Sequence, residues 1–314
     1  MGMLIDGRWE SDDVSSTAKD GSWRRAPSSF RNWLQTSDAD DSQFPAAPSR
    51  YHLYAAWNCP WAHRALLVRN AKGLTPHIAV SFAKPARSEQ GWIFASDGEF
   101  RDRLFGVHAL HELYTRADPG FTGRVTVPVL WDTETDKIVS NESADIVRMF
   151  NDAFARWTPG AVDLYPESHR REIEQWNERI HRTVNNGVYR AGFATSQAAY
   201  DEAVSALFET LELIERTLQQ SRYLCGDDIT EADWRLFPTL ARFDVAYHSA
   251  FKCNLKRITD FPALWKYARQ LYHWPGVKDT VRFDVYRAGY HSKSEKRNPH
   301  GIVPIGPQIA WNAA

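Results

Sequence analysis

A single cysteine stands where a β-rich segment at residues 51–57 meets a predicted helix that begins near residue 60. Backbone N–H groups and the positive end of the helix dipole stabilise a thiolate at such a position, and they can lower a cysteine pKa from about 8.5 to roughly 3.5–7.5. Pro60 suits the first helical turn because proline has no N–H to lose there. Cys59 is therefore the expected nucleophile. The structural alternative is a cysteine buried as a small hydrophobic residue.

Position 62 decides which kind of thiol chemistry we expect. A dithiol oxidoreductase would carry a resolving cysteine there, in a Cys-x-x-Cys pair, whereas this chain has Ala62. A mixed disulfide on Cys59 must then be released by an external thiol. The sequence therefore predicts monothiol chemistry.

Composition limits the partners of the protein. The chain has 314 residues, of which 43% are hydrophobic and 25% are charged, values typical of globular proteins. A net charge of −1 without a long basic run argues against nucleic acid or an anionic membrane as a partner. No stretch has the roughly 18 apolar residues of a membrane-spanning helix, and the first residues lack a signal-peptide core. The three widely spaced cysteines fit a reducing compartment, so we expect a cytoplasmic protein with small-molecule partners.

Hydrophobic patterning predicts the elements that position Cys59. In order they are a strand at 51–57, a helix at about 60–73, a strand at 77–82, a strand at 124–132, a partner strand at 137–140 and a helix within 141–150. The first three form a βαβ unit, which implies parallel strands. A polar segment from about 84 to 125 separates this βαβ unit from the strands and helix that follow it. Segments of that length usually carry function or short elements of their own.

A proline interrupts the strand predicted at 124–132. Proline inside a strand normally marks an edge or a bulge. A cis Val127–Pro128 bond would turn the backbone there and expose main-chain N–H and C=O groups to a ligand.

The pattern beyond about residue 158 is helical throughout. The predicted helices are 167–187, 197–220, 231–250, 261–273 and 276–283. Thr230 and Asp233 have the spacing of a capping box, with Ile229 placed as its hydrophobic staple, so we give Asp233 a structural role. Residues 1–50 are expected to form an irregular arm, and residues 291–314 an extended tail.

Six separated motifs occur in order along the chain. They are Cys59-Pro-Trp-Ala-His-Arg64, Gly91-Trp-Ile-Phe94, Thr126-Val-Pro-Val-Leu-Trp131, Asn141-Glu-Ser-Ala-Asp-Ile146, Asn185-Asn-Gly-Val-Tyr189-Arg-Ala-Gly-Phe193 and Asn298-Pro-His-Gly-Ile-Val-Pro-Ile-Gly-Pro307. Together they resemble the glutathionyl-hydroquinone reductases, also called xi-class glutathione transferases. The resemblance implies the cytosolic glutathione transferase fold, with an α/β thioredoxin-like N-terminal domain and an all-α C-terminal domain. The implied parts are an extension at 1–50, a glutathione-binding domain at 51–157, a helical domain at 158–290 and a tail at 291–314.

The resemblance also implies a site for glutathione as co-substrate. Cys59 would accept the glutathionyl group, and the glutathione would be held by Trp92, Arg124, Val127, Pro128, Glu142 and Ser143. The Val127 backbone can pair with the cysteinyl part as an added strand would. Ser143, at a helix start, can hold the γ-glutamyl carboxylate, and Glu142 can meet the ammonium group. As residues alone, Trp92 can equally be a core side chain, and Arg124 or Glu142 a solvated surface charge.

Two tyrosines resemble the family's proton donors to the second substrate. Tyr189 and Tyr290 would line a pocket between the domains, where a phenol can stabilise charge that develops on a substrate oxygen. Their spacing alone also fits core or interface tyrosines. Relatives often have a Tyr-Tyr pair where this chain has Tyr290-His291, so His291 either replaces the second phenol or changes the substrate preference.

The implied reaction is the glutathione-dependent reduction of glutathionyl-hydroquinones to hydroquinones. A Cys59–glutathione mixed disulfide forms, and a second glutathione resolves it to glutathione disulfide. The alternatives are a conjugating transferase, a thiol transferase acting on dehydroascorbate or mixed disulfides, and a non-enzymatic binding module. The resemblance further implies a homodimer. His108 and His111 have the spacing of metal ligands, but no third ligand is evident, and we expect no metal.

Overall fold

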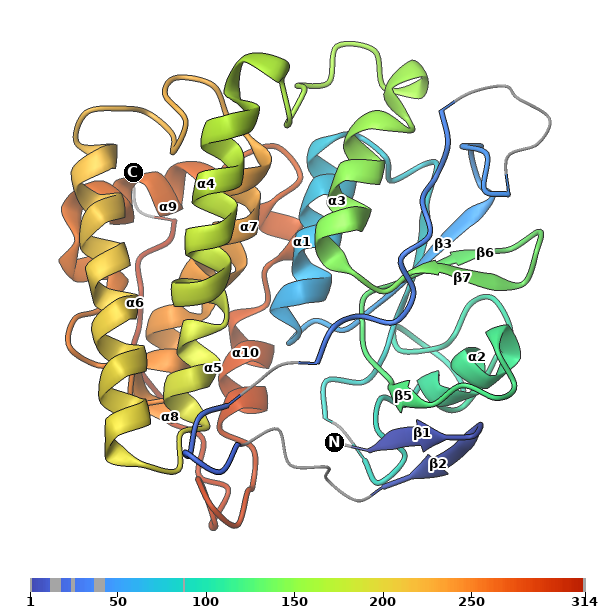
Figure 1. The fold of residues 1–314 in the computed structure, drawn as a ribbon, viewed down its shortest axis with the longest axis horizontal. Coiled ribbons are helices and arrows are strands. Elements are labelled where there is room, and N and C mark those ends of the chain that lie inside the picture. Colours follow the sequence, from blue (N-terminus) through green and yellow to red (C-terminus); the bar gives the residue numbers. More distant parts are fainter. Residues whose placement is uncertain (1, 12–17, 24–25, 37–42, 87, 313–314) are drawn as a thin grey trace. The chain divides into compact units, whose positions relative to one another are not determined.

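The computed structural model describes residues 2–11, 18–23, 26–36, 43–86 and 88–312 (Figure 1). It divides into two compact units, one within residues 1–14 and 27–162 and the other within residues 15–26 and 163–314. The first unit contains β1 (Met3–Ile5), β2 (Arg8–Glu10), β3 (Tyr51–Ala55), α1 (Pro60–Ala71), β4 (Ala79–Phe82), α2 (Leu110–Ala117), β5 (Gly123–Arg124), β6 (Val129–Asp132), β7 (Lys137–Ser140), α3 (Ser143–Asp152) and the 3-10 turn η1 (Ala155–Trp157).

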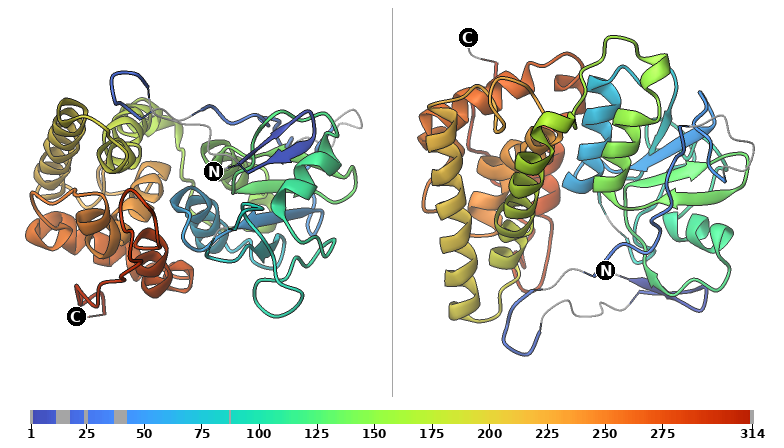
Figure 2. Two further views of the ribbon diagram at one scale, coloured as in Figure 1. Left: turned by 90° about the horizontal axis from the view of Figure 1, so that it is seen from below. Right: turned by 45° about the horizontal axis from the view of Figure 1, so that its top comes forward.

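A four-stranded mixed sheet forms the centre of the first unit, in the order β4-β3-β6-β7. β3 and β4 are parallel, whereas β6 is antiparallel to both β3 and β7, which confirms the predicted βαβ unit and the partner strand. α1 and α3 lie side by side on one face of the sheet, and α2 lies on the other (Figure 2). Every residue of β3 is buried, because helices cover both faces. The sheet thus holds the start of α1 on a rigid core.

The strand predicted at 124–132 is divided into β5 and β6, and Pro128 lies between them. The Val127–Pro128 peptide bond is cis, the geometry that the sequence analysis considered for this strand. β5 does not join the central sheet. It pairs instead with β1, in a small sheet of order β2-β1-β5.

The N-terminal arm contains a hairpin that the sequence analysis did not predict. β1 and β2 are antiparallel and are joined by Asp6 and Gly7, which have φ angles of 47° and 75°. An Asp-Gly pair with two positive φ angles is a strong hairpin signal, because its twist matches that of the strands. The signal is present in the sequence, where Asp6-Gly7 lies between Met3-Leu-Ile5 and Arg8-Trp-Glu10.

The second unit is helical, as predicted. Its elements are η2 (Glu167–His169), α4 (Arg170–Ile180), the π-helical turn η3 (His181–Asn185), α5 (Gly187–Gly192), α6 (Gln197–Leu218), α7 (Glu231–Arg242), the π-helical turn η4 (Phe243–Tyr247), α8 (His248–Ala250), η5 (Ile258–Asp260), α9 (Pro262–Tyr272), η6 (Lys278–Thr280) and α10 (Phe283–Tyr290). α7 packs against α4, α9 and α10 and is buried at nearly every position, so the core of this unit surrounds it.

The predicted capping box is confirmed at the start of α7. The Thr230 amide donates a hydrogen bond of 2.8 Å to the Asp233 carboxylate, which also accepts a bond from the Tyr267 hydroxyl. The helix predicted at 276–283 is wrong. Gly276 has a φ of 76°, and only the short turn η6 forms before α10 begins at Phe283. A positive φ at a glycine ends regular helical backbone, so the last helix starts later than its apolar pattern suggested.

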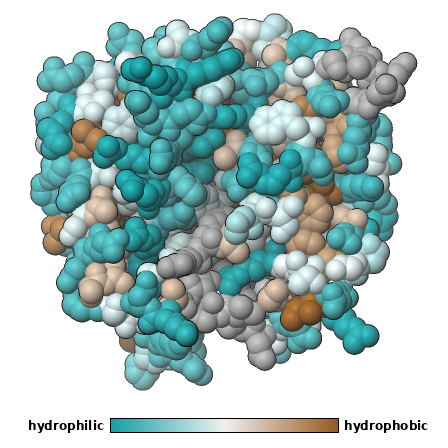
Figure 3. All heavy atoms as spheres, in the orientation of Figure 1, coloured by the Kyte–Doolittle hydropathy of each residue, from teal (hydrophilic) through white to brown (hydrophobic). Residues whose placement is uncertain are grey.

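No helix among the described residues is long and apolar enough to cross a membrane. On the face drawn in Figure 3, hydrophilic residues predominate and apolar residues form small separate patches.

Candidate active site

The Cys59 side chain caps α1. Its sulfur accepts a hydrogen bond from the Ala62 amide at 3.5 Å, and Pro60 occupies the first helical position. The thiol is partly exposed, which excludes the alternative of a fully buried hydrophobic cysteine. A sulfur at this position faces amide groups that have no partner within the helix, so the fold supplies the environment expected for a nucleophilic thiol.

Val127 and Pro128 lie beside this thiol. The Cys59 S–H group donates to the Val127 carbonyl oxygen at 3.4 Å. Within the described part of the chain, the Val127 amide has no hydrogen-bond partner, although its side chain is buried. The main-chain N–H and C=O of a residue outside the sheet ladders can pair with an extended peptide as an added strand would. This arrangement fits the cysteinyl part of glutathione.

Glu142 and Ser143 form the start of α3. The Glu142 carboxylate caps the helix by accepting a hydrogen bond from the Ala144 amide at 3.1 Å. Its other oxygen accepts a bond of 2.8 Å from the Ser28 hydroxyl, which belongs to the N-terminal arm. The Ser143 hydroxyl also donates to this carboxylate, at 3.4 Å. The sequence analysis did not predict Ser28.

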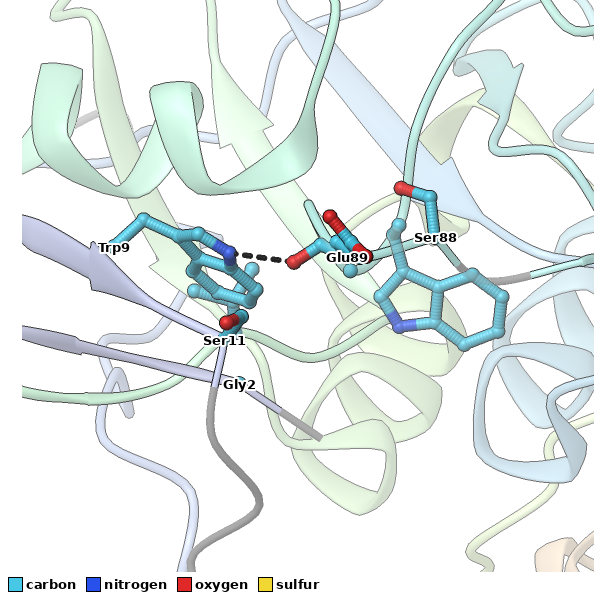
Figure 4. Close-up of a pocket in the computed structure, with 8 residues that line it drawn as sticks. Gly2, Trp9, Ser11, Ser88 and Glu89 are labelled. Atoms are coloured by element: carbon cyan, nitrogen blue, oxygen red, sulfur yellow. Dashed lines mark hydrogen bonds between the residues drawn. The ribbon is translucent and has the colours of Figure 1, made fainter. Parts of the chain in front are cut away.

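Trp92 lies in the wall of a pocket of about 190 Å³ that also includes Trp9 from β2 and Val125 (Figure 4). The Trp9 indole donates a hydrogen bond of 2.9 Å to the Glu89 carbonyl, and this bond joins the hairpin to the loop that precedes Trp92. Arg124 lies on β5, where it pairs with Met3 of β1. The N-terminal hairpin therefore positions two of the predicted glutathione residues.

Tyr189 and Tyr290 lie together in the second unit. Their hydroxyl oxygens are 2.6 Å apart, and the Tyr290 hydroxyl is also 3.0 Å from that of Tyr247. We call these three residues the tyrosine cluster. Burial raises the pKa of Tyr247 and of Tyr290 well above the usual value, so both phenols are neutral hydrogen-bond donors at physiological pH. The aromatic rings of Trp23, Phe193 and Phe251 pack against Tyr189.

Tyr247 is the member of the cluster that sequence reasoning missed. It ends the π-helical turn η4, and the π-helical turn η3 precedes the short helix of Tyr189. Such turns inside helices are rare and are frequent at functional sites. The spacing of apolar residues does not reveal such a turn, because a π-helical turn has the same kinds of residue as the α-helix around it.

His291 does not take the place of a phenol. Its Nδ1 donates to the Arg287 carbonyl at 2.9 Å, because a carbonyl can only accept. In the neutral ring, Nε2 then accepts from the Ser249 hydroxyl at 2.8 Å. Both ring nitrogens are thus engaged away from the cluster, and the additional phenol is Tyr247.

The other cysteines are buried. Burial raises the pKa of Cys225 to about 12 and raises that of Cys253 as well, so neither supplies a thiolate at physiological pH. Among the residues that the structure describes, no group of three or more His, Cys, Asp or Glu side chains is placed to hold a metal ion. His111 instead stacks on Trp9, with ring centroids 4.7 Å apart.

Comparison with known proteins shows the family. The model of the glutathione S-transferase N-terminal domain matches residues 58–153, and that of the C-terminal domain matches residues 197–270. The chain is 48% identical to glutathionyl-hydroquinone reductase YqjG of Escherichia coli K12 and covers 95% of it, with 98% of this chain aligned. It is 44% identical to glutathionyl-hydroquinone reductase PcpF of Sphingobium chlorophenolicum, over 98% of this chain and 96% of that protein.

Solved structures agree with this assignment. The structure of the xi-class transferase from Natrialba magadii has a TM-score of 0.91 and 45% identity, over 100% of this chain and 95% of that one. The protein belongs to the xi-class glutathione S-transferases. The glutathione-bound structure of YqjG has a TM-score of 0.88 and 45% identity, over 98% of this chain and 97% of that one.

The xi-class assignment agrees with the fold and with the arrangement of the predicted site residues. The fold is the thioredoxin-like domain followed by a helical domain, as predicted. In this xi-class transferase the predicted glutathione residues all belong to the first unit, whereas Tyr189 and Tyr290 belong to the second.

Proposed function

We propose that this transferase reduces glutathionyl-hydroquinones to hydroquinones, with glutathione as the reductant and Cys59 as the nucleophile. The proposal rests on one observation above all. The Cys59 sulfur caps α1 and accepts the Ala62 amide, while position 62 itself carries no second thiol. An enzyme with this arrangement forms a mixed disulfide that only an external thiol resolves.

The first unit holds the glutathionyl group. The Val127 amide and carbonyl pair with its cysteinyl part, and Glu142 accepts from its ammonium group. Ser143 and the amide groups at the start of α3 hold the γ-glutamyl carboxylate. Trp92, Pro128 and Arg124 complete the binding surface. These contacts place the sulfur of the bound group next to the Cys59 thiolate.

The reacting form of the substrate is the keto tautomer, in which a phenol proton has moved to the ring carbon that carries sulfur. The Cys59 thiolate attacks that sulfur, the S–S bond forms and the C–S bond breaks. The electron pair of the C–S bond passes to the ring oxygen, which becomes a phenolate. Tyr189 donates a proton to this oxygen, with Tyr290 hydrogen-bonded behind it.

A second glutathione completes the cycle. Its thiolate attacks the Cys59–glutathione disulfide and yields glutathione disulfide and free Cys59. The proton of this second thiol restores the tyrosine. The aromatic ring gains the two electrons that the two glutathione sulfurs lose, so no further reductant is required.

The test measures hydroquinone release from a glutathionyl-hydroquinone with purified protein and glutathione. Cys59→Ala should lose turnover, and wild type treated with substrate alone should carry a glutathione-sized adduct on Cys59. Cys59→Ser is the matched control, because serine keeps the helix cap but is a poor nucleophile. Turnover retained in Cys59→Ala would overturn the proposal.

Two other functions make different predictions. A conjugating transferase would keep its activity with chlorodinitrobenzene after Cys59→Ala, since no covalent intermediate is needed. A binding module would turn over none of these substrates. Activity on dehydroascorbate or on mixed disulfides would accompany the main reaction, because it uses the same Cys59 thiolate.

The setting of the enzyme is also a proposal. All three cysteines are free thiols in the structure, which supports a cytoplasmic location. We propose a homodimer on the strength of the family resemblance. We likewise retain the division into an extension at 1–50, a glutathione domain at 51–157, a helical domain at 158–290 and a tail at 291–314.

A further inference from the structure

Two arginine side chains lie against the tyrosine cluster or the rings that surround it, and the reaction described above does not use either of them. Arg242 ends α7, and Arg297 belongs to the C-terminal tail. The first is fully buried, and the second is exposed to solvent.

Arg242 lies on the buried side of the cluster. Its guanidinium group stacks over the Tyr286 ring at 3.7 Å, and its Nη1 donates to the Pro238 carbonyl at 2.9 Å. Tyr286 and Tyr290 are four residues apart on α10, so their side chains share one face of that helix. The Arg242 charge also interacts electrostatically with Tyr247, Tyr290 and Tyr189. Burial of a full charge is costly unless its surroundings compensate for it.

Arg297 lies over the aromatic rings next to the cluster. Its guanidinium carbon is 4.4 Å from the centroid of Phe193 and 5.5 Å from that of Phe251. Phe193 stacks on Tyr189, and Phe251 contacts both Tyr189 and Tyr290. A cation held over aromatic faces is well placed to interact with an anion at the edge of the same cluster.

The hydroxyl groups of the cluster form a chain that ends at Tyr189. These two hydrogen bonds use two of the three hydroxyl protons. Tyr247 is fully buried and Tyr189 is partly exposed, so Tyr189 is the member of the cluster that a ligand can reach from solvent. Hydrogen bonds in such a chain polarise one another.

We propose that Arg242 and Arg297 stabilise negative charge at the tyrosine cluster, so that the cluster binds a phenolate oxygen in preference to a neutral phenol. The inference rests on the proposed function, because the phenolate is the ring oxygen formed when the C–S bond breaks. Both arginines act as positioning residues: their fixed charges lower the energy of that anion before Tyr189 protonates it. The preferred substrates are glutathionyl-hydroquinones whose hydroquinone is a relatively strong acid.

Equilibrium binding of 4-nitrophenol tests this inference without turnover. Its phenolate absorbs visible light and its neutral form does not, so the ionised fraction of the bound ligand is measured directly. Wild type should bind the phenolate more tightly than the neutral form. Arg297→Gln should weaken phenolate binding by about fivefold or more, with little effect on binding of the neutral form, because only the anion interacts with the lost charge. Arg297→Lys should restore most of the preference.

Arg242 needs a variant that keeps the core intact. Arg242→Lys retains the charge and should retain the preference, whereas Arg242→Met removes the charge and should lose it. Arg222→Gln is the matched control for Arg297→Gln, since Arg222 is also an exposed arginine but stacks on Tyr223 instead of on a ring next to the cluster. If Arg242→Met does not fold, Arg297→Gln and its lysine variant still decide the question.

The outcomes separate the two proposals. Equal affinity for the phenolate in wild type and Arg297→Gln, or a preference for the neutral phenol, would overturn the role of the arginines even in an active reductase. A phenolate preference that is lost in Arg297→Gln supports it. Because binding is measured in Cys59→Ala as well, a failure of the reductase reaction leaves this readout intact.

Discussion

The Cys59 sulfur lies 3.4 Å from the main-chain carbonyl oxygen of Val127, a residue 68 positions away in the sequence. In the thiol form, Cys59 donates its proton to that oxygen. The proposed function has the Val127 amide and carbonyl pair with the backbone of glutathione, so bound glutathione would compete with Cys59 for this carbonyl.

Ala62→Cys should convert the monothiol site into a dithiol site. The amide at position 62 already lies 3.5 Å from the Cys59 sulfur, so a cysteine there is close to the mixed disulfide. In a single turnover without added glutathione, wild type should retain a glutathione adduct on Cys59. Ala62→Cys should instead release glutathione, and mass spectrometry should show a disulfide between Cys59 and the introduced thiol.

Ala62→Ser is the control for the larger side chain, because Ala62 is fully buried. It should keep the Cys59 adduct. A persistent adduct in Ala62→Cys would show that the helix start does not bring the two sulfurs together.

Gly91→Ala should weaken glutathione binding by about fivefold, or about 1 kcal/mol. Gly91 has a φ of 72°, and a Cβ there would be 2.9 Å from the Trp9 ring, so the loop that carries Trp92 must shift. Gly98→Ala is the matched control: Gly98 has a φ of 69°, but its Cβ would meet nothing within 4 Å. Both variants should lose about 1 kcal/mol of stability from the left-handed backbone.

Titration calorimetry with glutathione distinguishes the two glycine variants. If Gly98→Ala weakens binding as much as Gly91→Ala does, the contact with Trp9 does not position the loop.

Asp132→Asn should lower the free energy of unfolding by about 3 kcal/mol, because it leaves the Arg50 charge without its buried partner. Two hydrogen bonds of 2.7 Å join the Arg50 guanidinium to the fully buried Asp132 carboxylate. Glu134 pairs with the same arginine, but 62% of its side chain is exposed. Glu134→Gln should therefore cost less than about 1 kcal/mol. Urea denaturation measures both values, and equal losses would contradict this account.

The stability of the protein should fall as the pH decreases from about 6.5 to about 4, partly because of His52. Burial lowers the pKa of His52 from 6.5 to about 4, and its Nε2 is 2.8 Å from the Ser81 hydroxyl oxygen. In this pH window the unfolded state binds a proton that the folded state does not, so unfolding becomes more favourable as the pH falls. The full effect is about 3 kcal/mol.

The measurement is the difference in unfolding free energy between wild type and His52→Gln at several pH values. Glutamine does not titrate, so the difference should change across this window and remain constant above about pH 7. A difference that is independent of pH would show that His52 does not contribute.

The local features of this protein could be predicted from the sequence. The start of α1 at Cys59 and the capping box at Thr230 depend on side chains within one helical turn, so the residue types determine them. The alanine at position 62 likewise predicts monothiol chemistry without knowledge of the fold. The hairpin at Asp6 and Gly7 belongs to the same group, although its signal was overlooked.

Only the tertiary structure decided which distant residues meet. Tyr247 joins Tyr290 across 43 residues, and Tyr189 joins it across 101. Arg242 and Arg297 approach the cluster from two different segments of the chain. From the sequence alone, Arg242 fits an ordinary helix end and Arg297 fits a solvated tail. Side-chain packing selects such contacts from many possible pairs, and no local propensity encodes them. The sequence by itself therefore determined the family and pointed to Cys59 as the expected nucleophile, whereas the folded core decided the surroundings of the phenols.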